Sequence, residues 1–185
     1  MVTGPDDLIW PRDRSEEVGR YRHFRVRRDW YRLPRAGGLH DFYVLDMPDW
    51  VQVVPVTAAG RLVLVEQYRP GSRQVTLEFP AGLVDRGEGP VAAALRELAE
   101  ETGCRGGDAS LIGEYDPNPA LQNNRLYVVL VDGCLPGGER AQDPGEAIRV
   151  REAGEVELES LIDDGAFATA FGLVAWECYR RHRRR

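Results

Sequence analysis

The sequence predicts an α/β protein in which a mixed β-sheet lies between helices, with an additional β-rich extension at the N-terminus. Short segments rich in β-branched and aromatic residues recur along the chain, and such segments are typical of strands. Helical patterns occur once in the middle of the chain and again at its end. Strands combined with an early and a late helix favour a sheet covered by helices on both faces.

The expected strands are bounded by glycine, proline or polar residues. In chain order they are WVQVVPV (50–56), RLVLVEQY (61–68), VTLEFP (75–80), SLIGEY (110–115), RLYVVLV (125–131) and one or two strands within IRVREAGEVEL (148–158). The first two flank the turn TAAG and predict a hairpin. The segment 159–181 predicts two helical pieces broken near Gly165, and Glu159 is expected on a solvated turn.

The length of 185 residues suits about one compact domain. We expect an N-terminal extension with strands over residues 1–48, followed by a core domain over residues 49–185. In the extension, Phe24 and Val26 alternate with Arg25 and Arg27, as in a strand with one solvated face.

The composition, 43% hydrophobic with a net charge of −6, is typical of a soluble globular protein. No apolar run approaches the roughly 18 to 20 residues that span a bilayer, so we expect no membrane partner. The first residues, MVTGPDDLIW, lack a basic start and an apolar core, and we expect a cytoplasmic protein. The three cysteines are scattered and are interpreted as small buried residues.

Seven arginines lie between Arg20 and Arg35, and the chain ends in RRHRRR. Such runs can bind phosphate or nucleic acid. No compact recognition motif accompanies them, and arginine on a strand also discourages pairing between sheet edges. Nucleic acid is therefore not the favoured partner.

A helix is predicted over Pro90 to Thr102, because proline suits its first position and Gly103 its end. At about 100° per residue, Val91, Leu95 and Leu98 share one side of this helix. Glu97, Glu100 and Glu101 fall within an arc of about 100° on another side. We expect the first set to pack and the second to remain accessible.

Three carboxylates at this spacing repel one another, by a few tenths of a kcal/mol per pair, and lie at the helix end where the dipole disfavours negative charge. A solvated helix face is the simplest interpretation of such a string. A divalent cation would remove both penalties, since Mg²⁺ binds carboxylates, water and phosphates. Arg96, one turn before Glu100, is placed to orient a carboxylate, and Glu88 could reach the same place.

The spacing Gly82, five residues, Glu88, seven residues, RELAEETGC resembles the Nudix box, G-x5-E-x7-R-E-U-x-E-E-x-G-U. Its last position, normally a bulky aliphatic residue, is Cys104 here. The resemblance implies the Nudix fold, an α/β/α sandwich around a mixed sheet, and hydrolysis of nucleoside diphosphates linked to another group with Mg²⁺ or Mn²⁺. By position, it implies Glu97 and Glu101 as main metal ligands, Glu100 as a supporting ligand, the carbonyl of Ala81 as a further ligand, and Glu88 and Arg96 as orienting residues.

Residues outside the box resemble the ADP-ribose and nucleoside diphosphate-sugar pyrophosphatases: VEQYRP, LEFPAGLVDRGE, and Pro119 fifteen residues beyond Cys104. That branch implies a nucleotide-sugar substrate and a homodimer in which the N-terminal sheet exchanges between subunits. The segment after Pro119 lacks the pattern of the ADP-ribose enzymes, so a nucleoside diphosphate-hexose remains an alternative. An RNA-end hydrolase or other nucleotide pyrophosphohydrolase and a non-catalytic nucleotide-sugar-binding domain are the rivals.

Arg69 is expected by position to contact phosphate, or else to be an exposed strand-end arginine. Glu78 is expected to support the metal loop or bind a substrate hydroxyl. Trp30 and Tyr31 either stack on a base in the partner subunit's site or serve packing.

The general base of the resembled branch is a carboxylate in a loop late in the chain, here LPGGERAQDPGEAIRV. Pro144 stands where that base would lie. Glu146, which also corresponds to a residue that reaches the metals, is ranked first, followed by Asp143 and Glu139. A solvated acidic loop is the alternative interpretation.

Overall fold

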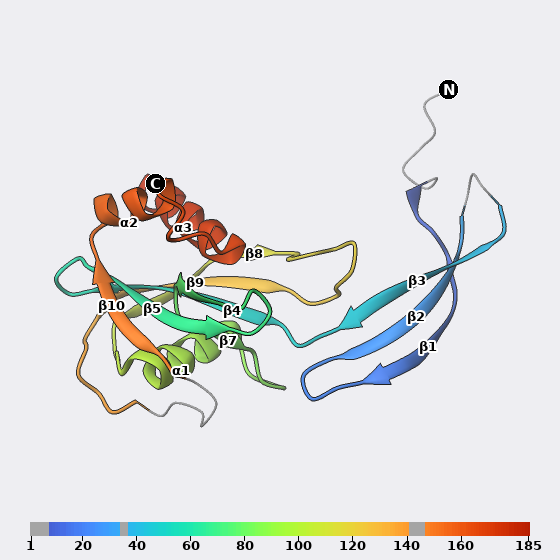
Figure 1. Ribbon diagram of the computed structural model, residues 1–185, viewed down its shortest axis with the longest axis horizontal. Coiled ribbons are helices and arrows are strands. Elements are labelled where there is room, and N and C mark those ends of the chain that lie inside the picture. Colours follow the sequence, from blue (N-terminus) through green and yellow to red (C-terminus); the bar gives the residue numbers. More distant parts are fainter. Residues whose placement is uncertain (1–7, 34–36, 141–146) are drawn as a thin grey trace. The chain divides into compact units, whose positions relative to one another are not determined.

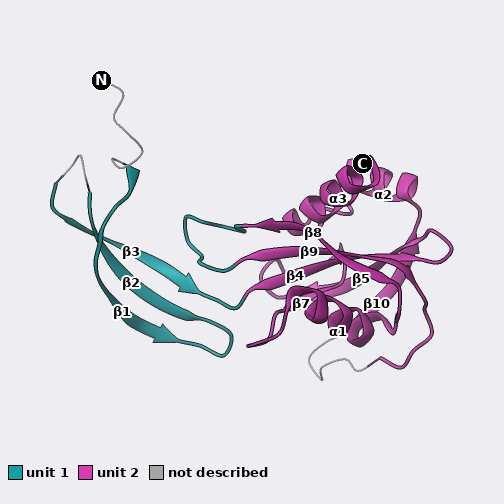
Figure 2. Ribbon diagram, turned by 180° about the vertical axis from the view of Figure 1, so that it is seen from behind, with its two compact units in different colours: residues 1–48, 116–124 teal, residues 49–115, 125–185 magenta. Residues whose placement is uncertain are grey.

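The computed structural model describes residues 8–33, 37–140 and 147–185. The chain forms two compact units (Figure 2): residues 1–48 with 116–124, and residues 49–115 with 125–185. The segment 116–124, which contains Pro119, therefore groups with the N-terminal strands and not with the core that surrounds it in sequence.

The first unit is a three-stranded antiparallel sheet. Its order is β1 (Arg12–Arg20), β2 (Arg25–Arg32) and β3 (Leu39–Asp46). The strand expected from the alternation around Val26 is β2, whose eight residues pair along their whole length with β3.

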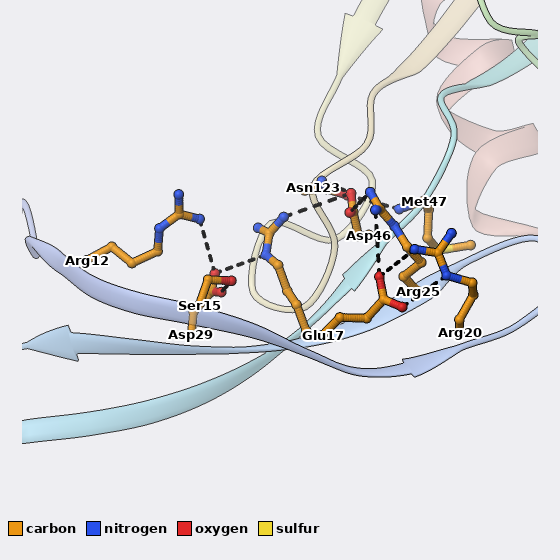
Figure 3. A network of polar contacts seen from close by, with 10 residues as sticks. Arg12, Ser15, Glu17, Arg20, Arg25, Asp29, Asp46, Met47 and Asn123 are labelled. Carbon is orange, nitrogen blue, oxygen red and sulfur yellow. Dashed lines mark hydrogen bonds and ion pairs between the residues drawn. The ribbon is translucent and has the colours of Figure 1, made fainter.

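Charged side chains connect the strands of this unit (Figure 3). Asp29 on β2 is fully buried and accepts hydrogen bonds from the hydroxyl of Ser15 at 2.5 Å and from Nε of Arg27 at 3.0 Å. Burial alone would raise the pKa of Asp29, but these bonds and the nearby Arg12 outweigh it and hold the pKa below its ordinary value. The buried charge is thus compensated within the sheet.

Asn123 explains why segment 116–124 belongs to the first unit (Figure 3). Its amide nitrogen donates to Asp46 at 2.6 Å, and its amide oxygen accepts the backbone N–H of Met47 at 3.1 Å. The backbone N–H of Leu45 also donates to the carbonyl of Leu121 at 2.8 Å. The segment is therefore held along the end of β3.

The second unit contains a seven-stranded mixed sheet (Figure 1). Its main path is β10-β5-β4-β9-β8, in which β4 and β9 are parallel, while β6 pairs with β5 and β7 with β4. The strands are β4 (Trp50–Thr57), β5 (Leu62–Arg69), β6 (Gln74–Glu78), β7 (Ala81–Leu83), β8 (Asp108–Tyr115), β9 (Leu126–Cys134) and β10 (Arg149–Ala153).

Helices cover both faces of this sheet: α1 (Pro90–Thr102) on one face, and α2 (Glu155–Asp163) with α3 (Ala170–Arg183) on the other (Figure 1). Side chains alternate between two cores, as strand geometry requires. Val53, for example, packs with the alanines of α1, whereas Val54 packs with α2 and α3. The expected α/β/α sandwich is confirmed.

The predicted bounds of the central helix are confirmed, since α1 spans Pro90–Thr102. Pro90 occupies its first turn, and Gly103 ends it with a φ of 72°, a left-handed conformation that glycine adopts without strain. The N–H of Gly103 donates to the carbonyl of Ala99 at 2.9 Å.

The predicted packing face of α1 was partly wrong. Leu95 is 38% exposed, whereas Ala93, Ala94 and Leu98 are fully buried. The small alanines let the helix approach the sheet closely. The helix is oriented with these alanines toward the sheet, and this orientation also buries Glu101, which is 3% exposed. The acidic face is therefore not wholly separate from the packing face.

The possible second strand within 148–158 was wrong, because Glu155–Asp163 is helix α2. Gly154 ends β10 in an extended conformation and caps the helix, and the side chain of Glu157 accepts the N–H of Gly154 at 3.3 Å. Val156 and Leu158 are apolar residues two positions apart, which is the spacing expected in a strand. In the helix, Val156 is 83% exposed and Leu158 is buried.

Glu159 was also misplaced as a residue on a solvated turn. It lies on α2, where it accepts the indole N–H of Trp176 at 3.0 Å and pairs with Arg180 at 3.4 Å. Cys104, Cys134 and Cys178 are buried free thiols, as expected. None of the helices in the described residues has the length and apolar character needed to cross a membrane.

Replacing Leu98 by alanine should lower the free energy of unfolding by about 2 to 5 kcal/mol, because a fully buried side chain of α1 is removed from the core. Urea titration followed by circular dichroism measures this change. Leu95→Ala on the same helix is the matched control and should cost far less. Equal losses for the two variants would contradict the observed orientation of α1.

Candidate active site

The tightest contact of the candidate site joins strand β7 to helix α1. A Cβ atom added to Gly82 would lie 2.0 Å from both the carboxyl carbon and Oε1 of Glu97. Real Cβ contacts are essentially never this short, so a side chain at this position would force the Glu97 carboxylate to move away from β7. Gly82 therefore forms a cradle in which the Glu97 carboxylate lies against the backbone of β7.

Glu101, one turn further along α1, also contacts β7. Its Oε2 accepts the backbone N–H of Ala81 at 3.2 Å, and the residue is only 3% exposed. A buried carboxylate needs hydrogen-bond donors or a cation to offset its lost hydration. Two carboxylates of one helix are thus drawn to one short strand.

Arg96 lies at the centre of the remaining carboxylates. One of its terminal nitrogens donates to Glu97 at 2.8 Å and to Glu100 at 3.2 Å. The other donates to Glu88 at 2.9 Å and to the carbonyl of Leu83 at 2.9 Å. These contacts, those to Glu88 above all, raise the pKa of Arg96, so the guanidinium remains charged and fixes the carboxylates around it.

Glu88 is held in the loop between β7 and α1. It accepts Nε of Arg96 at 3.2 Å in addition to the 2.9 Å bond, and it accepts the backbone N–H of Asp85 at 3.2 Å. The hydrogen bonds from Arg96 hold the pKa of Glu88 below its ordinary value. An ionised Glu88 therefore anchors Arg96 from the side opposite to α1's own glutamates.

The chemistry of this cluster fits a divalent cation that keeps most of its water. Four carboxylates, those of Glu88, Glu97, Glu100 and Glu101, lie around β7 and α1, and three of them contact Arg96. Within the described residues, no three His, Cys, Asp or Glu side chains form a ready-made metal cage. Mg²⁺ seldom requires one, since it binds through one or two carboxylates with water and substrate phosphates.

A second charged pair lies on the β5–β6 hairpin. Arg69 donates to the two carboxylate oxygens of Glu78 at 3.0 and 2.7 Å, and the Glu78 side chain is 8% exposed. Burial would raise the pKa of Glu78, but the bonds from Arg69 and Thr76 outweigh it and keep the pKa low. Arg69 and Glu78 were both predicted from the sequence as site residues, but their pairing was not predicted.

A cavity of about 590 Å³ opens beside this pair. The β5–β6 hairpin, Arg151 of β10 and the segment that joins α2 to α3 line it. Sequence reasoning missed Arg151 and residues 165–169 as possible site residues, because no motif links these distant segments.

Three other predicted site residues belong to the first unit. Trp30 is 8% exposed, and the guanidinium groups of Arg14 and Arg28 lie over its ring at 4.2 and 4.6 Å. Tyr31 packs edge-on against Phe42, with ring centroids 5.8 Å apart. These contacts favour the packing interpretation of both residues. Pro119 is exposed in a turn of segment 116–124.

Of the three candidate bases, Glu139 is exposed and lies just before the part of the loop that the structure leaves undescribed. Glu146 and Asp143 lie outside the described residues. Their position relative to α1 therefore remains a prediction.

Known proteins resemble this chain over part of its length. The chain resembles the ADP-sugar pyrophosphatase of Mus musculus, with 44% identity over 87 residues that cover 45% of this chain and 40% of that protein. It is 31% identical to the ADP-ribose pyrophosphatase of Bacillus subtilis over 110 residues, which cover 59% of this chain and 60% of that protein. The alignments thus span less than two thirds of both relatives.

The fold is shared with a solved structure described as an ADP compounds hydrolase, with a TM-score of 0.83 and 24% identity over 95% of this chain and 94% of that one. The model of the NUDIX domain matches residues 47–176, which include the β7 cradle, the whole of α1 and the Arg69–Glu78 pair. The chain therefore belongs to the NUDIX domain family.

Proposed function

We propose that this protein hydrolyses the pyrophosphate bond of ADP-ribose or a related nucleoside diphosphate-sugar, giving a nucleoside monophosphate and a sugar phosphate. The observation that carries the proposal is the cluster at β7 and α1, in which Gly82 accommodates Glu97 and Arg96 orients three carboxylates. The names of the two relatives above, an ADP-sugar and an ADP-ribose pyrophosphatase, support the substrate class.

Mg²⁺ or Mn²⁺ is the proposed cofactor. The residues that would hold it are Glu97, Glu101, Glu100 and the carbonyl of Ala81. When bound, such an ion neutralises pyrophosphate charge and lowers the pKa of an attacking water. Arg96 and Glu88 contribute by fixing the carboxylates, because a prearranged site loses less conformational entropy on binding.

Arg69 is proposed to bind substrate phosphate. A guanidinium carries five N–H donors. Nε and one terminal nitrogen of Arg69 each donate to a carboxylate oxygen of Glu78. Glu78 thereby holds the planar group of Arg69 in one orientation. Phosphate binding at this position would place the substrate along the β5–β6 hairpin, beside the cavity.

The general base is proposed to come from the loop that precedes β10, with Glu146 ranked before Asp143 and Glu139. The carboxylates of α1 are engaged with β7 and Arg96, so the residue that takes the proton of water must come from elsewhere. Glu139 is the member of this group that the structure describes, and its side chain is exposed.

A homodimer is proposed through the first unit. A three-stranded sheet needs a covered apolar face for stability, yet Trp10 and Phe42 are 44% and 38% exposed. Trp10 and Phe42 already pack together, with ring centroids 5.5 Å apart. Light scattering of the full chain should give twice the monomer mass, whereas a monomer at micromolar concentration would contradict the proposal.

Incubation with Mg²⁺ and separate samples of ADP-ribose, ADP-glucose, GDP-mannose, nucleoside triphosphates and capped RNA tests the function. We expect a sugar nucleotide to be cleaved fastest, with a nucleoside monophosphate and a sugar phosphate as products in the chromatogram. Faster turnover of triphosphates or capped RNA would contradict the substrate class. Binding of sugar nucleotides without turnover would identify a non-catalytic domain.

Amide substitutions separate the proposed roles. Glu97→Gln and Glu101→Gln should each lower kcat by at least about 100-fold, about 2.7 kcal/mol in the barrier, because a metal-binding charge is lost. Glu146→Gln should lower kcat by about 100-fold or more, as expected for a general base. Steady-state kinetics at saturating Mg²⁺ measure these changes.

Glu177→Gln on α3 is the matched control, because Glu177 forms an exposed helical pair with Arg181 and should be dispensable. If Glu101→Gln were as active as Glu177→Gln, the proposed metal site would be contradicted. If Glu146→Gln retained full activity, Asp143→Asn and Glu139→Gln would be measured next. Full activity in all three would exclude this loop as the source of the base.

A further inference from the structure

The cavity beside the β5–β6 hairpin has the size of a ligand site and is partly open to solvent. Its volume of about 590 Å³ lies within the range of about 300 to 1,000 Å³ typical of small-molecule sites. Its walls come from three parts of the second unit: the β5–β6 hairpin, Arg151 of β10, and residues 165, 166, 168 and 169 between α2 and α3. The cavity is thus built within one unit.

The lining chemistry suits a ligand rich in hydroxyl groups. Carboxylates, hydroxyls and an amide provide several hydrogen-bond acceptors and donors around a floor of small aliphatic side chains. No aromatic ring occurs among the lining residues, all of which are described, so the cavity offers no surface on which a nucleobase would stack. The polar lining residues are two arginines, Arg69 and Arg151, together with Glu66, Glu78, Ser72, Thr76, Gln74 and Thr169.

Each of the two carboxylates of the cavity pairs with an arginine, Glu78 with the lining residue Arg69 and Glu66 with the exposed Arg149. Arg69 donates to both oxygens of Glu78, and Arg149 pairs with Glu66 at 3.0 Å. An ionised carboxylate has about four lone-pair sites. Glu78 also accepts the hydroxyl of Thr76 at 2.5 Å and keeps about one free site, whereas Glu66 keeps more. Charge-assisted hydrogen bonds from sugar hydroxyls to such oxygens are stronger than neutral ones.

The cavity also lies at a suitable distance from the carboxylate cluster. Glu78 precedes Ala81 by three residues, so their Cα atoms are at most about 11 Å apart. Ala81 in turn contacts Glu101. The cavity and the carboxylate cluster are therefore joined by the short stretch of main chain from β6 to β7.

We propose that the cavity between the β5–β6 hairpin and the α2–α3 segment binds the sugar end of the substrate and not its base. This assignment rests on the proposed function, in which water cleaves ADP-ribose into AMP and ribose 5-phosphate. It makes residues 165–169 a wall that determines which sugars are accepted. Gly165, Ala166 and Ala168 are small residues that line this wall, so larger side chains at the two alanines would add bulk beside the cavity.

Filling the cavity tests the proposal. Ala166→Leu and Ala168→Leu add bulk at exposed positions that line it, and Ala58→Leu, in the exposed turn between β4 and β5, is the matched control. Calorimetric titration with ribose 5-phosphate and with AMP measures the two ends of the substrate without requiring turnover. KM for ADP-ribose is measured in parallel.

We expect both filling variants to weaken ribose 5-phosphate binding at least about tenfold and to raise KM for ADP-ribose, with AMP affinity changed less than about twofold. Unchanged ribose 5-phosphate affinity in both variants would overturn the assignment. Equal weakening of AMP and ribose 5-phosphate, or no ribose 5-phosphate binding to the wild type, would overturn it as well.

The same measurements distinguish failure of this inference from failure of the proposed function. If the wild type hydrolysed no sugar nucleotide but the selective loss of ribose 5-phosphate binding were observed, the function would be wrong and the sugar cavity would stand. If the wild type hydrolysed ADP-ribose and filling changed neither KM nor binding, the cavity assignment alone would be wrong.

Discussion

The close approach of the Glu97 carboxylate to the backbone of Gly82 is the constraint on which the candidate site depends. A side chain at position 82 would collide with this carboxylate in its observed position, so the carboxylate lies against β7 because residue 82 is glycine. The orientation of α1 that brings Glu97 to Gly82 also packs Ala93 and Ala94 in the core and brings Glu101 to the N–H of Ala81. Packing and site geometry therefore share one cause.

Electrostatics explain why such a site needs Arg96. Carboxylates three or four residues apart on a helix repel one another, and burial of Glu101 adds the cost of lost hydration. Arg96 offsets part of this repulsion by contacting Glu88, Glu97 and Glu100. One guanidinium shared by several carboxylates leaves negative charge near β7. This charge favours a divalent cation, which can in turn bind substrate phosphate.

Local signals were sufficient for part of the fold. The bounds of α1 were predictable because Pro90 and Gly103 have strong preferences at helix ends, and the strands because their apolar runs are bounded by turns. Leu95 was misassigned because a helical wheel treats every leucine as buried, whereas here alanines allow the closer approach. The Arg69–Glu78 pair was not predictable because it depends on the register of the β5–β6 hairpin, and the cavity because packing between distant segments forms it.

Binding of Mn²⁺ to the wild type and to Gly82→Ala, measured by calorimetry and by electron paramagnetic resonance, tests the central claim most directly. Gly71→Ala is the matched control, because a Cβ atom at that glycine would meet nothing within 4 Å. We predict that Gly82→Ala loses at least about tenfold in Mn²⁺ affinity while Gly71→Ala binds as the wild type does, with circular dichroism unchanged in both. Equal Mn²⁺ affinity in all three proteins would contradict the account.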